Sequence, residues 1–382
     1  MIYLDSAATT PVRREVLDAM WPYLTAEFGN PSSSHALGHR AAEALQQARA
    51  KIAATLGCRA SEITFTSGGT EADNLAVKGI ALANPRGRHI VTTPIEHEAI
   101  LASCDYLHRH HNFAITMAPV DRYGMVSATT FADALRDDTT LATVMLANNE
   151  VGTIQPVAEL AALARARGIP FHTDAVQAGG ALDLNVTALG VDALSLSGHK
   201  LGTPKGIGAL YVRSRLQMEP LLHGGGQERG RRSGTEDVAG AVGLAKALEL
   251  ASTERAERMS RLAQLRDELI RGILAAVPTA ILTGHRTDRL PGNASFCFPG
   301  TSGEAILLQL EERGILCSSG SACAAGLDEP SHVLLAMGLS PEVAQTAVRL
   351  SLHDSLAAAS IPQVILAVRD ACEAVRSMQP RI

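Results

Sequence analysis

The chain has 382 residues, of which 46 % are hydrophobic and 19 % are charged, and its formal net charge is −5. These values are typical of a folded protein large enough for two domains, and they argue against a disordered chain and against a nucleic-acid-binding protein. The N-terminus lacks the features of a secretory signal and no stretch is apolar enough to span a membrane, so we expect a cytoplasmic protein.

Strand-like and helical segments alternate through the first part of the chain. A short helix near 15–24 and a long amphipathic helix over 36–56 come first, and a serine of Ser32-Ser-Ser34 is placed to cap the second helix. We then expect strands over 63–66, 90–93, 114–117, 142–147, 171–173, 193–196 and 208–212, and helices over 70–84, 98–110, 127–135 and 157–167. This repetition predicts an α/β fold with a mainly parallel seven-stranded sheet and helices on both faces.

The rest of the chain predicts a second, smaller unit. Residues 234–276 are rich in Ala, Leu, Glu and Arg and contain no proline, so we expect one or two long helices there. An α+β unit follows, with strands expected over 281–282, 294–298 and 347–352 and helices over 303–313 and 357–378. We therefore assign residues 15–257 to a large domain, and residues 1–14 and 258–382 to a small domain.

Residues that can bind a ligand or take part in catalysis follow several of the expected strands. Ligands of such sheets bind beyond the carboxyl ends of the strands, so a site is expected at these positions. The turn Ser67-Gly-Gly-Thr70 precedes a helix and suits an anion, because a helix N-terminus offers free N–H groups. Other strands are followed by His97, Asn149, Asp174 and Lys200. Each also has an ordinary explanation, such as a simple turn, a helix cap, an Asx turn or a solvated lysine.

Taken together, these residues match the needs of pyridoxal 5'-phosphate. That cofactor has a phosphate, a pyridinium nitrogen that pairs with a carboxylate, a phenolic oxygen that accepts a hydrogen bond, a ring face that stacks, and an aldehyde that reacts with a lysine. An anion-binding turn, an imidazole, amides, one acid and one lysine at one end of one sheet supply these partners. The convergence, rather than any single residue, predicts this cofactor.

Short blocks along nearly the whole chain carry a family resemblance. In order they are Tyr3-Leu-Asp-Ser-Ala-Ala-Thr-Thr-Pro11, Phe28-Gly-Asn-Pro-Ser-Ser-Ser-His35, Thr66-Ser-Gly-Gly-Thr-Glu-Ala-Asp-Asn74, Glu96-His97, Asn148-Asn-Glu150, His172-Thr-Asp-Ala-Val-Gln177, Ser197-Gly-His-Lys200, Gly224-Gly-Gly-Gln-Glu-Arg-Gly230, Arg232-Ser-Gly-Thr235, Ser318-Ser-Gly-Ser-Ala-Cys323 and Val348-Arg-Leu-Ser351. The chain resembles the NifS/IscS-like cysteine desulfurases, within the class V aminotransferase family of fold-type I pyridoxal-phosphate enzymes. The resemblance implies the fold and the cofactor of that family.

The resemblance also implies a role for each matching residue. Lys200 corresponds to the lysine that forms a Schiff base with the cofactor and moves the substrate α-proton. Asp174 corresponds to the partner of the pyridine nitrogen, and His97, a further catalytic residue, to the group stacked on the ring. Gln177 corresponds to the donor to the phenolic oxygen. The remaining expected cofactor contacts are Gly69, Thr70, Asn149, Ser197 and His199.

Two further sets of residues complete the implied site. Asn149 and Arg349 correspond to the residues that bind the substrate carboxylate, a role that suits the planar fork of an arginine. Thr235 corresponds to a phosphate ligand that a second subunit contributes, which implies a homodimer. The segment 224–235, with its glycines and arginines, would then reach across the interface between the subunits.

The six cysteines include no Cys-x-x-Cys pair, which argues against a disulfide framework and against a structural zinc site. Cys323 lies among Gly, Ser and Ala, which do not pack a core, so we expect a mobile loop over about 317–330. The resemblance implies that Cys323 is the nucleophile, which takes the sulfur of L-cysteine as a persulfide and releases L-alanine. That persulfide is also the one metal contact we expect, as a transient ligand of a growing iron–sulfur cluster.

The leading interpretation is a cysteine desulfurase that supplies sulfur for iron–sulfur clusters and thio-cofactors through a scaffold or acceptor protein. A selenocysteine lyase or an ordinary aminotransferase is an alternative enzyme, although an aminotransferase needs no loop cysteine. A non-catalytic binding protein with the same fold is an alternative of another class. The presence of a full set of catalytic residues argues against it: Lys200, Asp174, His97 and Cys323. The chain departs from the family at 353–354, where His-Asp stands in place of the common Gly-Arg.

Overall fold

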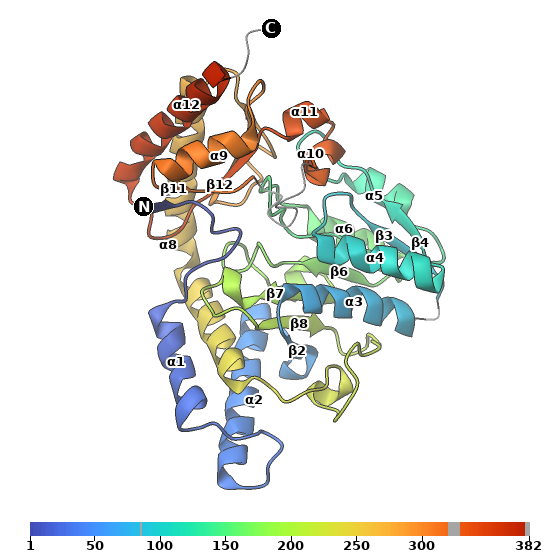
Figure 1. Cartoon of the computed structure of the whole chain (residues 1–382). Helices are drawn as coiled ribbons and strands as arrows, with labels where there is room; N and C mark the ends of the chain where they lie inside the picture. Colours follow the sequence, from blue (N-terminus) through green and yellow to red (C-terminus); the bar gives the residue numbers. More distant parts are fainter. Residues whose placement is uncertain (85, 320–328, 379–382) are drawn as a thin grey trace.

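A seven-stranded sheet forms the centre of the large domain (Figure 1). The computed structural model describes residues 1–84, 86–319 and 329–378. The strand order is β2-β8-β7-β6-β5-β3-β4, where β8 is antiparallel to both neighbours and all other pairs are parallel. The mainly parallel seven-stranded sheet is therefore confirmed. Its strands are β2 (Ile63–Thr66), β3 (His89–Thr92), β4 (Ala114–Met117), β5 (Thr139–Thr143), β6 (Phe171–Asp174), β7 (Ala193–Ser197) and β8 (Gly208–Val212).

Helices cover both faces of this sheet because its strands alternate their buried side chains between two apolar clusters. On β8, Ala209 and Tyr211 belong to one cluster, while Leu210 and Val212 belong to the other. The second cluster is completed by α3 (Gly69–Ala83) and α4 (Glu98–His111). The first is completed by α1 (Arg14–Thr25), α2 (Ala36–Leu56), α5 (Ala128–Ala134), α6 (Val157–Ala166), the short α7 (Val186–Leu189) and the first half of α8 (Val238–Ala276).

The long helix α8 connects the two parts of the molecule. It is a single helix that packs against α1 and α2 at one end and against α12 (Ile361–Met378) at the other (Figure 1). There a three-stranded sheet, β12-β10-β9, and the pair β1-β11 contribute to a separate apolar cluster. The small-domain elements are β1 (Ile2–Tyr3), β9 (Ile281–Leu282), β10 (Asn293–Cys297), α9 (Gly303–Glu312), β11 (Ile315–Leu316), α10 (His332–Ala336), α11 (Pro341–Ala344) and β12 (Ala347–Ser351).

The separate clusters support a division of the chain within α8, which we propose at 257/258. The small-domain cluster contains Leu4 together with residues from Leu262 onward, so the N-terminal strand belongs with the C-terminal part. None of the described helices is long and apolar enough to cross a membrane.

Two local expectations were wrong. The strand expected over 142–147 is β5 (Thr139–Thr143), whose first residues are buried threonines rather than an apolar run. The backbone beyond it still bonds to β6, since the amide of Leu146 donates to the carbonyl of Asp174. The residue that caps α2 is His35, whose Nδ1 accepts from the amide of Gly38, and not one of the preceding serines.

Candidate active site

The carboxyl ends of β2 and β7 meet at one edge of the sheet. Both strands pair with β8, and both Thr66 and Ser197 lie opposite Gly208. The helix α3 starts directly after β2, and the 3-10 turn η2 (Gly198–Lys200) directly follows β7. A Cβ at Gly69 would lie 3.3 Å from that of Ser197, so glycine permits this close approach. Lys200 and the turn 67–70, which we expect to bind an anion, are therefore neighbours.

The amine of Lys200 is held by the N-terminal segment of the chain. Its Nζ donates to the carbonyl of Ala7 at 2.5 Å and to that of Ala8 at 2.7 Å. The amide of Gln177 donates to the same Ala7 oxygen at 2.9 Å. Thr10 fixes the segment on the turn, because its hydroxyl donates to the carbonyl of His199 at 2.8 Å. Gln177, the expected donor to the phenolic oxygen, thus lies beside the expected Schiff-base lysine.

Asp174 ends β6 and is buried among the other candidates. Burial raises the pKa of its carboxyl, and the positive charges of His97 and Lys200 act in the opposite direction. Both residues are therefore close enough to Asp174 to affect its charge. Its Oδ1 accepts from the amide of Val176 at 2.8 Å, which closes an Asx turn at the strand end.

His97 is the N-cap of α4. Its Nδ1 accepts from the amide of Ala99 at 3.1 Å, which satisfies one of the donors of the first helical turn. The ordinary explanation for a histidine at this position is therefore correct. It does not compete with ring stacking, since the capping bond uses one ring nitrogen whereas stacking uses a face of the imidazole.

The two residues expected to bind the substrate carboxylate contact one another. Asn148 forms an Asx turn, with its Oδ1 accepting from the amides of Glu150 and Val151. This turn presents Asn149, whose carbonyl accepts from Nη1 of Arg349 at 3.0 Å. Arg349 comes from the small-domain strand β12 and also pairs with Asp5 at 2.8 Å. The small domain therefore supplies one half of this pair, and the large domain supplies the other.

Ser197 and Thr70, two further expected phosphate ligands, lie near the start of α3. Ser197 is buried at the end of β7, whereas Thr70 is exposed in the first turn of α3. Burial lowers the pKa of His199 to about 4, helped by the nearby charges of Lys200 and Lys205. His199 is therefore a neutral imidazole at physiological pH, and its Nδ1 lies 3.2 Å from the hydroxyl of Thr9.

The glycine- and arginine-rich segment lies outside this group. Thr235 is exposed, and α8 begins at Val238. The guanidinium of Arg232 pairs at 2.8 Å with Glu71 of its own chain, in the first turn of α3. The segment is thus anchored at the first turn of α3.

Cys323 lies outside the described residues. The five described cysteines are free, and burial raises the pKa of each thiol to about 11 or 12: Cys58, Cys104, Cys297, Cys317 and Cys372. These thiols are protonated at neutral pH and are weak nucleophiles. Within the described ranges, no group of three or more His, Cys, Asp or Glu side chains is arranged to bind a metal.

A buried polar layer beneath Asp174 was not assigned from the sequence. His172 lies 2.9 Å from the hydroxyl of Ser195 and 3.9 Å from Oδ1 of Asp73. Burial lowers the pKa of His172 to about 3 and, together with the charge of Asp174, raises that of Asp73. His172 and Asp174 are two residues apart on β6 and face the same side of the sheet, so strand alternation could have revealed this layer.

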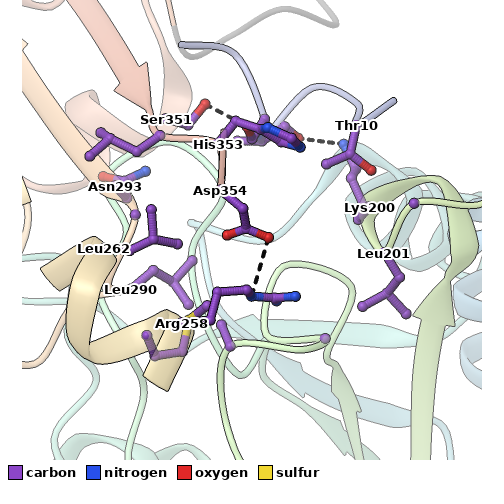
Figure 2. A pocket seen from close by; sticks show the side chains of 18 of the residues that line it. Thr10, Lys200, Leu201, Arg258, Leu262, Leu290, Asn293, Ser351, His353 and Asp354 are labelled. Carbon is purple, nitrogen blue, oxygen red and sulfur yellow. Dashed lines mark hydrogen bonds and ion pairs between the residues drawn. The ribbon is translucent and has the colours of Figure 1, made fainter. Parts of the chain in front are cut away.

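A cavity of about 610 Å³ reaches Lys200 from the junction of the two domains (Figure 2). Its lining includes Gln177 from the large domain and Ser351 from the small domain. The unusual His353-Asp354 pair also lines it, and Asp354 lies 3.4 Å from Arg258 on α8. Figure 2 shows Lys200 on one wall and the Arg258–Asp354 pair on another.

The residues at this edge fit pyridoxal phosphate. The buried Asp174 carboxyl has a raised pKa, and a protonated ring nitrogen would supply the positive charge that favours its ionised form. A Cβ added at Gly68 meets nothing within 4 Å, so there is space before the N-terminus of α3 for a phosphate. Lys200 provides an amine at the same edge.

Comparisons with known proteins identify the family. The Aminotransferase class-V family matches residues 2–363. The Cysteine desulfurase IscS of Methanosarcina thermophila is 49 % identical over 99 % of this chain and 94 % of its own length. The IscS-like cysteine desulfurase of Mycobacterium tuberculosis is 48 % identical over 94 % of this chain and 93 % of its own.

Solved structures show the same similarity. A NifS-like protein superposes with a TM-score of 0.91 at 36 % identity, covering 98 % of this chain and 99 % of its own. SspA, solved in complex with cysteine, superposes with a TM-score of 0.81 at 38 % identity, covering 92 % of this chain and 99 % of its own.

Proposed function

The chain belongs to the class V aminotransferase family and is a pyridoxal-phosphate-dependent cysteine desulfurase, and we propose that Cys323 receives the sulfur of L-cysteine. The observation that carries the site assignment is the convergence of Lys200, Asp174 and His97 at one edge of the sheet. The raised thiol pKa values of the described cysteines support Cys323 over Cys317 as the reactive thiol.

In this proposal the chain's own residues position the substrate. Arg349 and Asn149 hold the carboxylate of L-cysteine, for which Arg349 turns part of its guanidinium from Asp5 to the substrate. Lys200 leaves the carbonyls of Ala7 and Ala8 and accepts the α-proton of the substrate. When bound, pyridoxal phosphate supplies the electron sink that stabilises the negative charge left at the α-carbon.

Sulfur transfer then requires a thiolate. The Cys323 thiolate attacks the substrate sulfur, a sulfur–sulfur bond forms, and the carbon–sulfur bond breaks. The electron pair of the broken bond stays with the substrate fragment. This fragment takes up one proton at the β-carbon, regains the α-proton from Lys200, and leaves as L-alanine. Asp174 would hold the pyridine nitrogen of the bound cofactor, whose positive charge would favour the ionised carboxylate.

A pair of cysteine variants tests this assignment. The variant Cys323→Ser should retain the cofactor and bind L-cysteine, but should form no persulfide, sulfide or alanine, because a hydroxyl is a poor nucleophile toward sulfur. Cys317→Ala is the matched control and should remain active. The assignment is wrong if Cys317→Ala is inactive while Cys323→Ser still produces alanine from L-cysteine.

The comparisons name cysteine desulfurases and no selenocysteine lyase among the relatives reported above, which supports cysteine as the substrate. We propose iron–sulfur cluster assembly and thio-cofactor synthesis as the destination of the sulfur, and the reducing cytoplasm as the compartment. A direct competition between L-cysteine and L-selenocysteine tests the choice of substrate, since a cysteine desulfurase should use L-cysteine efficiently in the mixture.

We also propose that the active protein is a homodimer with shared sites. Trp21, Leu24 and Phe28 are exposed on and after α1, where α1 and the connected end of α2 project from the molecule (Figure 1). Large apolar side chains gathered in one exposed region are typical of an interface. A symmetric contact there would allow each subunit to lend Thr235 to the other.

Mixing two inactive variants tests the shared site. Lys200→Ala removes the amine, and Thr235→Glu places a negative charge at the expected phosphate contact. A heterodimer of the two would contain one site with both changes and one with neither, so activity should return on subunit exchange. Arg232 is unsuitable for this test because it pairs with Glu71 of its own chain. No recovery despite demonstrated exchange would show that each chain builds its own site.

A further inference from the structure

Two side chains at the start of α10 contact the residues that flank His97 and Asn149. The hydroxyl of Ser331 donates to Oε2 of Glu150 at 2.5 Å. The Nε2 of His332 lies 3.0 Å from the carbonyl oxygen of Glu96. Ser331 and His332 come from the small-domain side of the chain, after the segment that contains Cys323. These contacts join that side to the two strand ends of the candidate site.

The contacts are formed in a largely buried interface. Glu150 is only 4 % exposed, and burial raises the pKa of its carboxyl, opposed by the Ser331 hydrogen bond and by the charges of His332 and Arg349. Beside it lies a mixed apolar cluster, to which the large domain contributes Ile95, Met145 and Val151, and the α10 region contributes Val333, Leu334 and Met337. The start of α10 is therefore fixed against the ends of β3 and β5.

Ser318, five residues before Cys323 in the sequence, is also held at the site. Ser318 forms an isolated antiparallel bridge with Arg349, in which the amide of Arg349 donates to the Ser318 carbonyl at 2.6 Å. Of the described residues on either side of Cys323, Ser318 is thus fixed on the expected substrate-carboxylate binder, and Ser331 and His332 are fixed on the neighbours of Asn149 and His97. Fixing both ends of a chain segment close to a substrate raises the effective concentration of a group carried between them.

We propose that Ser331 and His332, with Glu150 as the acceptor, are positioning residues for sulfur transfer to Cys323. They set the point at which the chain returns to the large domain, and so increase the rate at which the thiol meets the bound substrate. This inference rests on the proposed role of Cys323. It assigns no contact with the reacting atoms to Ser331, His332 or Glu150.

The structure suggests variants that remove each contact and variants that restore it. Glu150→Ala removes the acceptor and leaves Ser331 free to cap α10, where its Oγ accepts from the amide of Leu334. Glu150→Gln keeps an acceptor oxygen for the Ser331 hydroxyl. In the same way His332→Leu removes the side-chain contact, and His332→Gln keeps an N–H donor. Ser340→Ala is the matched control, because Ser340 precedes α11 without a side-chain capping bond and its hydroxyl interacts with the exposed Glu342 of the same helix.

The experiment separates substrate binding from sulfur transfer in the holoenzyme. The change in cofactor absorbance on adding L-cysteine reports binding, and mass spectrometry of rapidly quenched single turnovers reports the persulfide on Cys323. Glu150→Ala and His332→Leu should bind L-cysteine like the wild type but form the persulfide about tenfold more slowly. Both glutamine variants should recover most of the rate, and Ser340→Ala should match the wild type.

Two results would overturn the proposal. Persulfide formation in Glu150→Ala and His332→Leu at the rate of Ser340→Ala would show that the contacts do not position the thiol. Equal losses in substrate binding and in persulfide formation, without recovery in the glutamine variants, would show a general structural role. The variant Cys323→Ser tests the proposed function separately. A persulfide formed in that variant would show that Cys323 is not the sulfur acceptor, whatever the role of Ser331 and His332.

Discussion

A buried ion pair between Arg49 and Glu228 fixes the segment that leads to Thr235. The side chains are 3 % and 2 % exposed and form two charge-assisted hydrogen bonds of 2.7 Å. Glu228 also accepts from the amide of Phe65 at 2.9 Å, and Arg49 donates to the carbonyl of Ile63 at 2.8 Å. The pair therefore connects α2, the edge strand β2 and the segment before α8.

Removing one partner of this pair should be strongly destabilising. In Glu228→Ala, the guanidinium of Arg49 stays buried without a counter-charge and the amide of Phe65 loses its acceptor. Breaking a buried pair in this way typically costs about 3–5 kcal/mol of the free energy of unfolding. The double variant Arg49→Leu with Glu228→Leu should recover part of that loss, because no unpaired charge remains in the core.

Urea unfolding followed by circular dichroism measures these differences. Asp18→Ala is the control, because it breaks the Arg14–Asp18 pair, whose side chains are 81 % and 57 % exposed. Exposed pairs contribute little, so this variant should unfold close to the wild type. The reasoning fails if Glu228→Ala is no more destabilised than Asp18→Ala, or if the double variant is less stable than Glu228→Ala.

Three further predictions concern single residues near the site. Lys200→Ala should lose the covalently held cofactor and all turnover, while Lys205→Ala keeps both, as mass spectrometry after borohydride reduction would show. Asp174→Asn should bind the cofactor but turn over at least about tenfold more slowly, a loss of ~1.4 kcal/mol in transition-state stabilisation, measured as alanine release at full cofactor occupancy. Burial raises the pKa of the Glu96 carboxyl from 4.5 to about 8. Between these two pH values the folded protein retains a proton that the unfolded chain has released, so the free energy of unfolding falls as the pH rises from 4.5 to about 8. Glu96→Gln should reduce this fall, which urea midpoints at both ends of the window would reveal; an unchanged pH profile would contradict the raised pKa.

Most strands and helices of the large domain were predictable because their sequences carry the apolar pattern typical of a strand or a helix. The helix over 36–56 and the strands over 63–66, 114–117 and 208–212 have the expected bounds. The error at β5 arose because Thr139 and Thr140 are polar yet fully buried, and their burial depends on partners from elsewhere in the chain. One such partner is His89, whose Nδ1 lies 2.8 Å from the hydroxyl of Thr139.

The positions of the candidate residues at strand ends were likewise predictable, but their partners were not. The rule that ligands bind beyond the carboxyl ends of parallel strands placed His97, Asp174 and Lys200 at one edge without any tertiary information. The contacts of Lys200 with Ala7 and Ala8 could not be found in this way, because the partners are 193 and 192 residues apart in the sequence. The contact of Ser331 with Glu150 is of the same kind, because these residues are 181 positions apart in the sequence.

The structural and functional explanations of a site residue are compatible because each uses different atoms. His97 caps α4 through Nδ1, and Asp174 closes a turn through Oδ1, so both side chains are oriented by the local backbone. An imidazole or carboxylate held in this way needs no reorganisation when a ligand arrives, which is the condition for effective electrostatic catalysis. A helix cap or an Asx turn at the end of a buried strand therefore does not argue against a role in catalysis. When only the sequence is known, treating the two explanations as exclusive underestimates the catalytic importance of such residues.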